Sequence, residues 1–143
     1  MPFVFNPFTG ELDGIADPID DAFTFPADCS ASEGVGDCVY VSSDLVSGVI
    51  QVRKADVTDS SKMPSIGIIL YKPTTTTCIV VYLGAFPVGV LPSFLPGKKY
   101  YVGASSKPVS VTPTAPAIIQ IVGIALDSGR LLFNPSPSMV KVT

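Results

Sequence analysis

The pattern of apolar and polar positions changes every few residues along this chain. Short runs rich in β-branched residues alternate with Gly, Pro, Asp and Ser, and no window of helix length lacks a proline, a glycine or a β-branched run. The runs predict strands at 38–42, 48–54, 66–71, 78–83, 99–102, 109–112, 118–126 and 130–133. With a few shorter segments this makes about eight to ten short strands. The pattern therefore predicts an all-β fold, a small β-barrel or a sandwich.

The longest uncharged stretch, Thr74–Gly97, matches a membrane helix in raw hydropathy, since such a helix needs roughly 20 apolar residues. Prolines at 87, 92 and 96 argue against a helix, because each removes a backbone donor that would have no partner in hydrocarbon. We expect instead two strands joined by an apolar crossing and a Leu95-Pro96-Gly97 turn, with no membrane insertion.

The apolar crossing carries more large side chains than a hairpin needs for its own core. Phe86, Val90 and Phe94 are its main residues, and we expect part of this segment to face another subunit. Packing within the chain's own core is the alternative. In the following strand, Tyr100 and Tyr101 place one ring on each face, and Tyr101 is the expected contact residue.

The first 22 residues predict an extended N-terminal arm, and residues 23–143 a single β-barrel domain. Phe3, Phe5 and Phe8 are apolar anchors among prolines and a glycine that prevent a continuous helix. The terminus has neither the basic region nor the long apolar region of a signal peptide, so we expect none.

Composition adds the expectation of a partner. The chain is 47% hydrophobic and only 15% charged, against the usual quarter of charged residues in soluble domains. Since little charge is available to cover the surface, part of that surface is expected to be an interface or an oligomer contact.

The net charge of −3 hides a division along the chain. The segment before Arg53 holds nine acidic residues and no basic one, whereas the remainder holds nine basic and three acidic residues. The acidic arm either is a solvated segment or docks on the basic half of a neighbouring copy or on another basic surface. The chain has no cluster of basic residues interleaved with aromatic residues, so its sequence does not predict nucleic-acid binding.

The three cysteines, Cys29, Cys38 and Cys78, have no paired spacing. Free buried thiols and a Cys29–Cys38 disulfide are both compatible with the sequence.

The residues offer little for catalysis. The chain has no histidine, which removes the commonest general base and metal ligand. Ser138–Lys141 matches the S-x-x-K pattern but lacks its companion motifs. The loop carboxylates Asp37, Asp44, Asp56 and Asp59 lack EF-hand spacing and are expected to be solvated. We therefore expect no enzyme, no cofactor and no metal site.

Five sequence segments, taken in their order along the chain, give it a resemblance to a family of small bacteriophage virion proteins. This family includes capsid decoration (cement) proteins and phage fibre domains. The segments are NPFTGELD at 6–13, GDCVYV at 36–41, KMPSIG at 62–67, LPGKKYYV at 95–102 and VGIAL at 122–126 followed by Leu131-Leu132. Each segment alone is ordinary strand and turn chemistry, and their order and spacing carry the resemblance.

The resemblance implies a homotrimeric β-barrel or tulip-like sandwich domain on a virion, made in the bacterial host cytoplasm and without a catalytic role. A cement protein would bind and stabilise the shell through the major capsid protein or another virion protein, using the arm to clip neighbours. The alternative is a tail-fibre or baseplate module that attaches to the host through the loops Asp56–Lys62 and Ser105–Lys107. The single compact domain without a repetitive stalk favours the cement protein.

Overall fold

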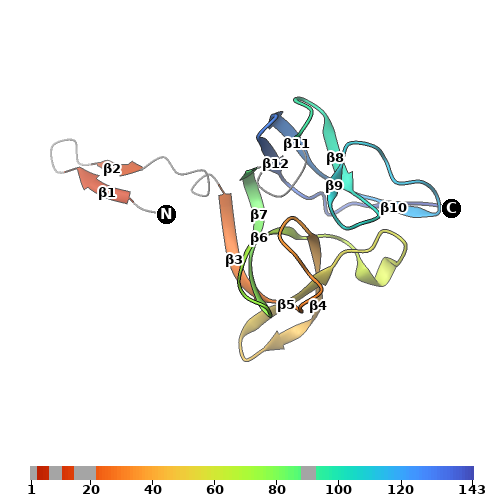
Figure 1. Ribbon diagram of the computed structural model, residues 1–143, viewed down its shortest axis with the longest axis horizontal. Helices are drawn as coiled ribbons and strands as arrows, with labels where there is room; N and C mark the ends of the chain where they lie inside the picture. Colours follow the sequence, from red (N-terminus) through yellow and green to blue (C-terminus); the bar gives the residue numbers. More distant parts are fainter. Residues whose placement is uncertain (1–2, 7–10, 15–21, 88–92) are drawn as a thin grey trace.

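The computed structural model describes residues 3–6, 11–14, 22–87 and 93–143, and it shows the predicted all-β fold (Figure 1). Within these residues the only helical segment is a 3-10 turn, η2 (Ser60–Lys62). The strands are β1 (Phe3–Asn6), β2 (Glu11–Gly14), β3 (Ala22–Asp28), β4 (Cys38–Val46), β5 (Val49–Lys54), β6 (Gly67–Thr74), β7 (Thr77–Pro87), β8 (Lys99–Val102), β9 (Pro108–Val109), β10 (Ala117–Ile119), β11 (Ile121–Asp127), β12 (Arg130–Phe133) and β13 (Val140–Val142).

Five strands close into a barrel in the order β3-β5-β4-β6-β7. Closure depends on β3, which pairs in parallel with β5 at Ala27↔Ile50 and antiparallel with β7 along its whole length. All other pairs in the barrel are antiparallel. The barrel predicted from the sequence is therefore confirmed, and closure removes the exposed strand edges that an open sheet would present.

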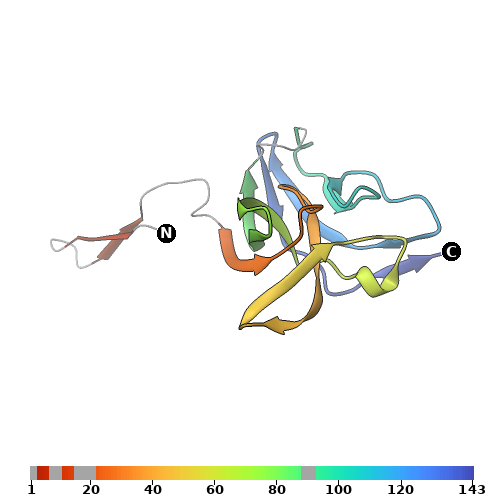
Figure 2. The same cartoon turned by 60° about the horizontal axis from the view of Figure 1, so that its bottom comes forward.

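Strand β7 joins the barrel to the C-terminal strands. Its final residues, Gly84–Pro87, pair with β12, and the sheet continues through β11 and β8 to β9. Figures 1 and 2 show this C-terminal part, coloured cyan to blue, beside the orange-to-green barrel. Strands β10 and β13 form a separate two-stranded sheet.

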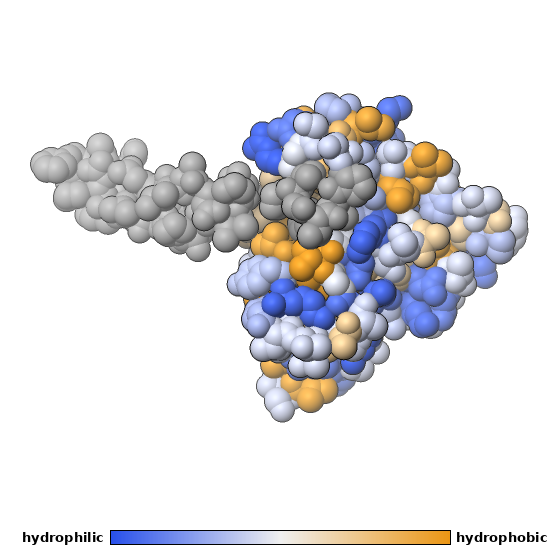
Figure 3. Space-filling model, viewed as in Figure 1, coloured by the Kyte–Doolittle hydropathy of each residue, from blue (hydrophilic) through white to orange (hydrophobic). Residues whose placement is uncertain are grey.

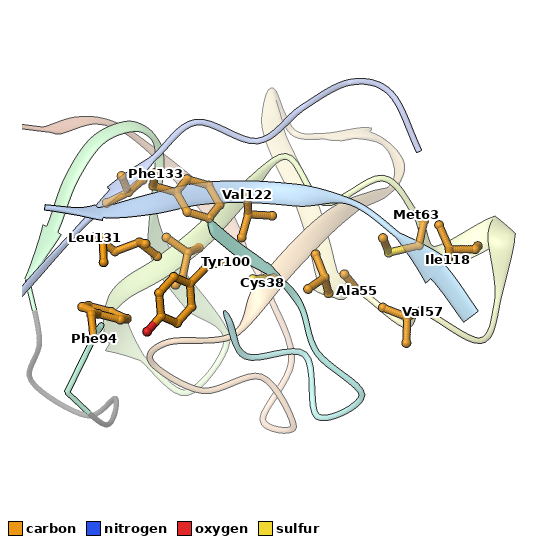
Figure 4. Packing of buried hydrophobic residues seen from close by; sticks show 14 of the residues in the cluster. Cys38, Ala55, Val57, Met63, Phe94, Tyr100, Ile118, Val122, Leu131 and Phe133 are labelled. Atoms are coloured by element: carbon orange, nitrogen blue, oxygen red, sulfur yellow. The ribbon is translucent and has the colours of Figure 1, made fainter. Parts of the chain in front are cut away.

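The barrel strands are apolar on both faces because each face belongs to a different core. Val39, Ile69 and Val80 pack in one cluster, while the residues next to them, Cys38, Ile68 and Val81, pack in a second cluster. Successive side chains of a strand point to opposite faces, so the continuous apolar runs of the sequence fill two cores. The second cluster includes Phe94, Tyr100, Leu131 and Phe133 (Figure 4).

Two glycines in strands, Gly67 and Gly123, lie where neighbouring backbones approach closely. A Cβ at Gly67 would contact the Val80 side chain and lie 2.8 Å from the Val81 carbonyl oxygen. A Cβ at Gly123 would overlap the Leu132 carbonyl oxygen on the paired strand. Neither position has room for a larger residue.

The Thr74–Gly97 stretch agrees with its prediction only in part. The turn before β8 is present, with the Lys98 amide donating to the Leu95 carbonyl at 3.1 Å, and β8 has its predicted bounds. The two flanking strands are not a hairpin, because β12 and β11 lie between β7 and β8. No helix in the described part of the chain is long and apolar enough to span a bilayer.

Two other strand predictions differ from the structure. The run 118–126, predicted as one strand, is divided at Gln120 into β10 and β11, which belong to different sheets. Of 109–112 only Val109 is in a strand.

The N-terminal segment is consistent with an arm. Strands β1 and β2 pair antiparallel with each other, with Phe5 opposite Leu12 and Val4 opposite Asp13. They pair with no other strand that the structure describes.

Candidate interaction surfaces

The predicted interface residues lie in different settings. Phe94 is a core residue, 4% exposed, and its ring meets Tyr100 edge-on with centroids 5.2 Å apart. Its apolar character is thus accounted for inside the chain. Tyr101 is half-buried on the other side of β8, so the prediction that the two tyrosines face opposite ways is confirmed.

The other predicted interface residues are placed only by their backbone or not at all. Phe3 and Phe5 lie in β1, and Phe86 lies in β7 opposite Leu131. Phe8 and Val90 are outside the described residues.

An aromatic groove, which the sequence reasoning missed, lies on the outside of the barrel. Its volume is 410 Å³ and its lining is mostly aromatic and proline side chains. The lining residues are Phe25, Pro64, Ser65, Ile66, Tyr82, Pro135, Ser136 and Pro137. Phe23, 60% exposed, extends this surface. The available sequence signal was the Phe23-Thr24-Phe25 alternation at the start of β3.

Two of three adjoining aromatic rings, those of Phe25 and Tyr82, line this groove. Tyr82 on β7 lies between the two phenylalanines of β3, with ring centroids 6.2 Å from Phe23 and 5.7 Å from Phe25. Contacts of this kind contribute beyond the area they bury, so the three rings hold each other in place at the surface.

Gln120 fixes two walls of the aromatic groove. Its Oε1 accepts from the Ser65 amide at 2.8 Å, and its Nε2 donates to the Ser65 carbonyl at 2.8 Å and the Ser136 carbonyl at 2.7 Å. The side chain is 1% exposed and these bonds satisfy it. This clamp joins the segment before β6 to the segment after β12, and it explains why the strand divides at Gln120.

A second apolar surface covers the outside of β12, β11 and β8, and we call it the outer face. Leu132, Ile124 and Lys99 lie directly opposite one another across the three strands, so they share one side of the sheet. Leu126 lies two residues from Ile124 on the same side, and Leu132, Ile124 and Leu126 are 40%, 44% and 48% exposed.

A third apolar surface is the tip of the β4–β5 hairpin. Ser47 and Gly48 both have positive φ, 52° and 77°, as the tight hairpin turns that match strand twist require. Leu45 and Val46, just before this turn, are both more than half exposed. In the view of Figure 3, apolar side chains form separate patches on the surface.

A polar cluster fastens the loops at one end of the barrel. Asp37, 3% exposed, accepts from Lys107 Nζ at 2.6 Å and from the Gly34 amide at 2.8 Å. Lys72 Nζ donates to the carbonyls of Ser30 and Glu33 at 2.9 and 2.8 Å. The expectation that Asp37 is a solvated loop carboxylate is wrong, because Asp37 is buried and its charged partner, Lys107, comes from a distant loop.

The Glu33 carboxylate is also held by hydrogen bonds. Burial raises the pKa of Glu33, but donation from Ser30, Ser32 and the Lys54 amide outweighs it and leaves the pKa below the ordinary 4.5. An adjoining pocket of 410 Å³ has Tyr40, Arg53, Lys54 and Lys62 beside acidic residues, so its lining favours neither sign of charge.

The remaining loop carboxylates hold local turns. Asp56 accepts from the Thr58 hydroxyl and amide, and Asp59 from the Ser61 hydroxyl and amide, which lowers the pKa of both below 3.8. Among the described residues no group of three His, Cys, Asp or Glu side chains could hold a metal ion.

All three cysteines are free and buried, so Cys29 and Cys38 are not bridged. Burial raises the pKa of the Cys38 thiol to about 12. Burial and the neighbouring Cys29 likewise raise the pKa of Cys78 to about 12. The Cys38 and Cys78 thiols are therefore protonated and poorly nucleophilic at neutral pH.

The fold and these surfaces define an all-β protein built on a closed five-stranded barrel that presents several apolar surfaces. Comparison with family models, with curated proteins and with solved structures found no match for this chain.

Proposed function

We propose that this protein is a non-enzymatic bacteriophage virion protein, a homotrimeric decoration (cement) protein that binds and stabilises an assembled capsid shell. The observation that carries the proposal is the aromatic groove, an open apolar surface on a rigid barrel. Apolar patches of this kind mark sites of protein association. The low charge content and the resemblance to virion β-domains point the same way.

The lining of the aromatic groove indicates the kind of contact it makes. Its side chains include no charged group, and its polar atoms are those of two serines and the Tyr82 hydroxyl. Aromatic residues in such positions contribute a large share of binding energy at protein interfaces. The groove therefore suits an apolar segment of a capsid protein.

The test is binding of the purified protein to expanded shells that lack it. Tyr82→Asp should weaken shell binding about tenfold or more, because it places a charge among aromatic side chains. Tyr71→Asp is the matched control, since Tyr71 is 49% exposed and does not line the groove. Wild-type protein that stays monomeric and ignores shells would contradict the proposal, as would equal binding by both variants.

The β4–β5 tip favours a second candidate, a tail-fibre or baseplate module that attaches to the host. Exposed Leu45 and Val46 on a tight turn form a projecting apolar contact. The loop Ser105–Lys107, predicted for that role, is tied down instead, since Lys107 binds Asp37 and the Ser106 hydroxyl donates to the Ala55 carbonyl. Labelled protein that adheres to host cells through Leu45 and not to shells would favour this candidate.

A further inference from the structure

The outer face of β12, β11 and β8 has an unpaired apolar surface next to basic residues. Leu132, Ile124 and Leu126 are 40–48% exposed in the single chain, so this face is open to contact with a second molecule. Lys99 stands opposite Ile124 on the same side, and exposed Lys98 precedes it. In the described part of the chain, no carboxylate lies within 4.0 Å of either lysine.

The N-terminal arm has the complementary character. Residues 1–21 contain Glu11, Asp13, Asp17, Asp20 and Asp21 and no basic residue. In the β1–β2 pairing Phe5 is opposite Leu12 and Asn6 is opposite Glu11. The arm thus combines three phenylalanines with a strong negative charge.

A two-stranded sheet of this size needs a supporting surface. An isolated hairpin is at best marginally stable in water, and β1 and β2 pair with no other described strand. The outer face supplies what the arm lacks, an apolar surface flanked by cations. Opposite charge at the edge of such a contact favours its formation and its register.

From these observations we infer that the arm of one copy docks on the outer face of a second copy, with its acidic residues beside Lys98 and Lys99. The inference rests on the proposed homotrimer and assigns one of its contacts. It uses a surface distinct from the aromatic groove, so the two can be tested separately.

The experiment measures the mass of the full chain in solution by light scattering and sedimentation, without shells. The wild type is expected to be a trimer. Lys98→Glu with Lys99→Glu should weaken association about tenfold, as should Asp13→Lys with Asp17→Lys, since each reverses two charges at one edge. An equimolar mixture of the two variants should regain association, because arm and face are then complementary between copies.

A second pair of variants tests the apolar part. Ile124→Asp should disrupt the trimer, whereas Leu45→Asp, which alters a more exposed apolar strand residue elsewhere, should leave it intact. Melting temperatures close to wild type confirm that each variant is folded.

The outcomes separate this inference from the proposed function. A trimer that survives both the lysine and the Ile124 substitutions overturns the arm contact, and shell binding by that trimer would leave the proposed function standing. Loss of the trimer in these variants, with rescue on mixing, supports the contact even if the wild type ignores shells. A wild type that is monomeric at about 100 µM, well above the concentration at which micromolar association saturates, overturns it outright.

Discussion

At the scale of single residues, this fold depends on positions where side-chain size decides. Gly123 on β11 lies against the β12 backbone. The two strands can approach this closely only because glycine has no side chain. Nearby Gly129, in the β11–β12 turn, has ordinary space, since a Cβ there would lie 3.5 Å from Asp127 Oδ1. The two glycines are therefore not equivalent, although both occur in one hairpin.

Gly123→Ala is expected to destabilise the protein by about 1–3 kcal/mol, because the methyl group forces β11 and β12 apart. Gly129→Ala should change the unfolding free energy by less than about 1 kcal/mol. Urea unfolding followed by tyrosine fluorescence measures both. Equal midpoints for the two variants would show that the strands separate at little cost.

At the scale of elements, buried polar groups join segments that are distant in sequence. Gln120 holds the segments before β6 and after β12 together. Asp37 binds Lys107 in the loop before β9, and the Cys38 amide donates to the Ser106 carbonyl at 2.6 Å. These bonds place the β8–β9 loop against the barrel.

Asp37→Ala should cost about 1–3 kcal/mol of stability, since it breaks a half-buried ion pair with Lys107 and leaves the Gly34 amide without its acceptor. Asp127→Ala removes the exposed ion pair with Arg130, which spans 3.0 Å, and should cost far less. Thermal unfolding compares the two. A similar loss of stability in the two variants would contradict the larger contribution expected from Asp37.

At the scale of the whole molecule, the carboxylates make stability dependent on pH. Glu33, Asp56, Asp59 and Asp127 all have a pKa below the ordinary value in the folded protein, the last through the Gly129 amide and Arg130. The folded state therefore holds fewer protons than the unfolded state in acid. Stability is fully present above the ordinary values of 4.5 and 3.8 and is lost as the pH falls through the lower folded values.

The urea midpoint should accordingly be constant from pH 7 to about 5 and fall below pH 4.5, the ordinary Glu value. Glu33→Gln should lower the midpoint at pH 7 and reduce the decrease between pH 5 and about 3, because one of the four groups no longer titrates. A midpoint in the wild type that stays level down to about pH 3 would contradict this assignment.

Local patterns of residues were sufficient to predict the fold class and most of the strands. Strand β8 and the strand at 130–133 lie where the local pattern predicts them. β-branched runs, turn residues and strand glycines act over a few neighbouring residues, so a single chain segment is enough to recognise them. The apolar runs at Cys38-Val39 and Ile68-Ile69 were recognisable as strands for the same reason.

Only the tertiary structure decided which strands are neighbours and which side chains are exposed. The placement of β12 and β11 between β7 and β8 depends on contacts between residues far apart in the sequence. The burial of Asp37 and Phe94 and the exposure of Phe23 and Tyr82 depend on such contacts too. Burial depends on what packs opposite a residue, and Asp37 meets Lys107 from 70 positions away. The candidate interaction surfaces therefore emerge only when the barrel closes and the C-terminal strands pack beside it.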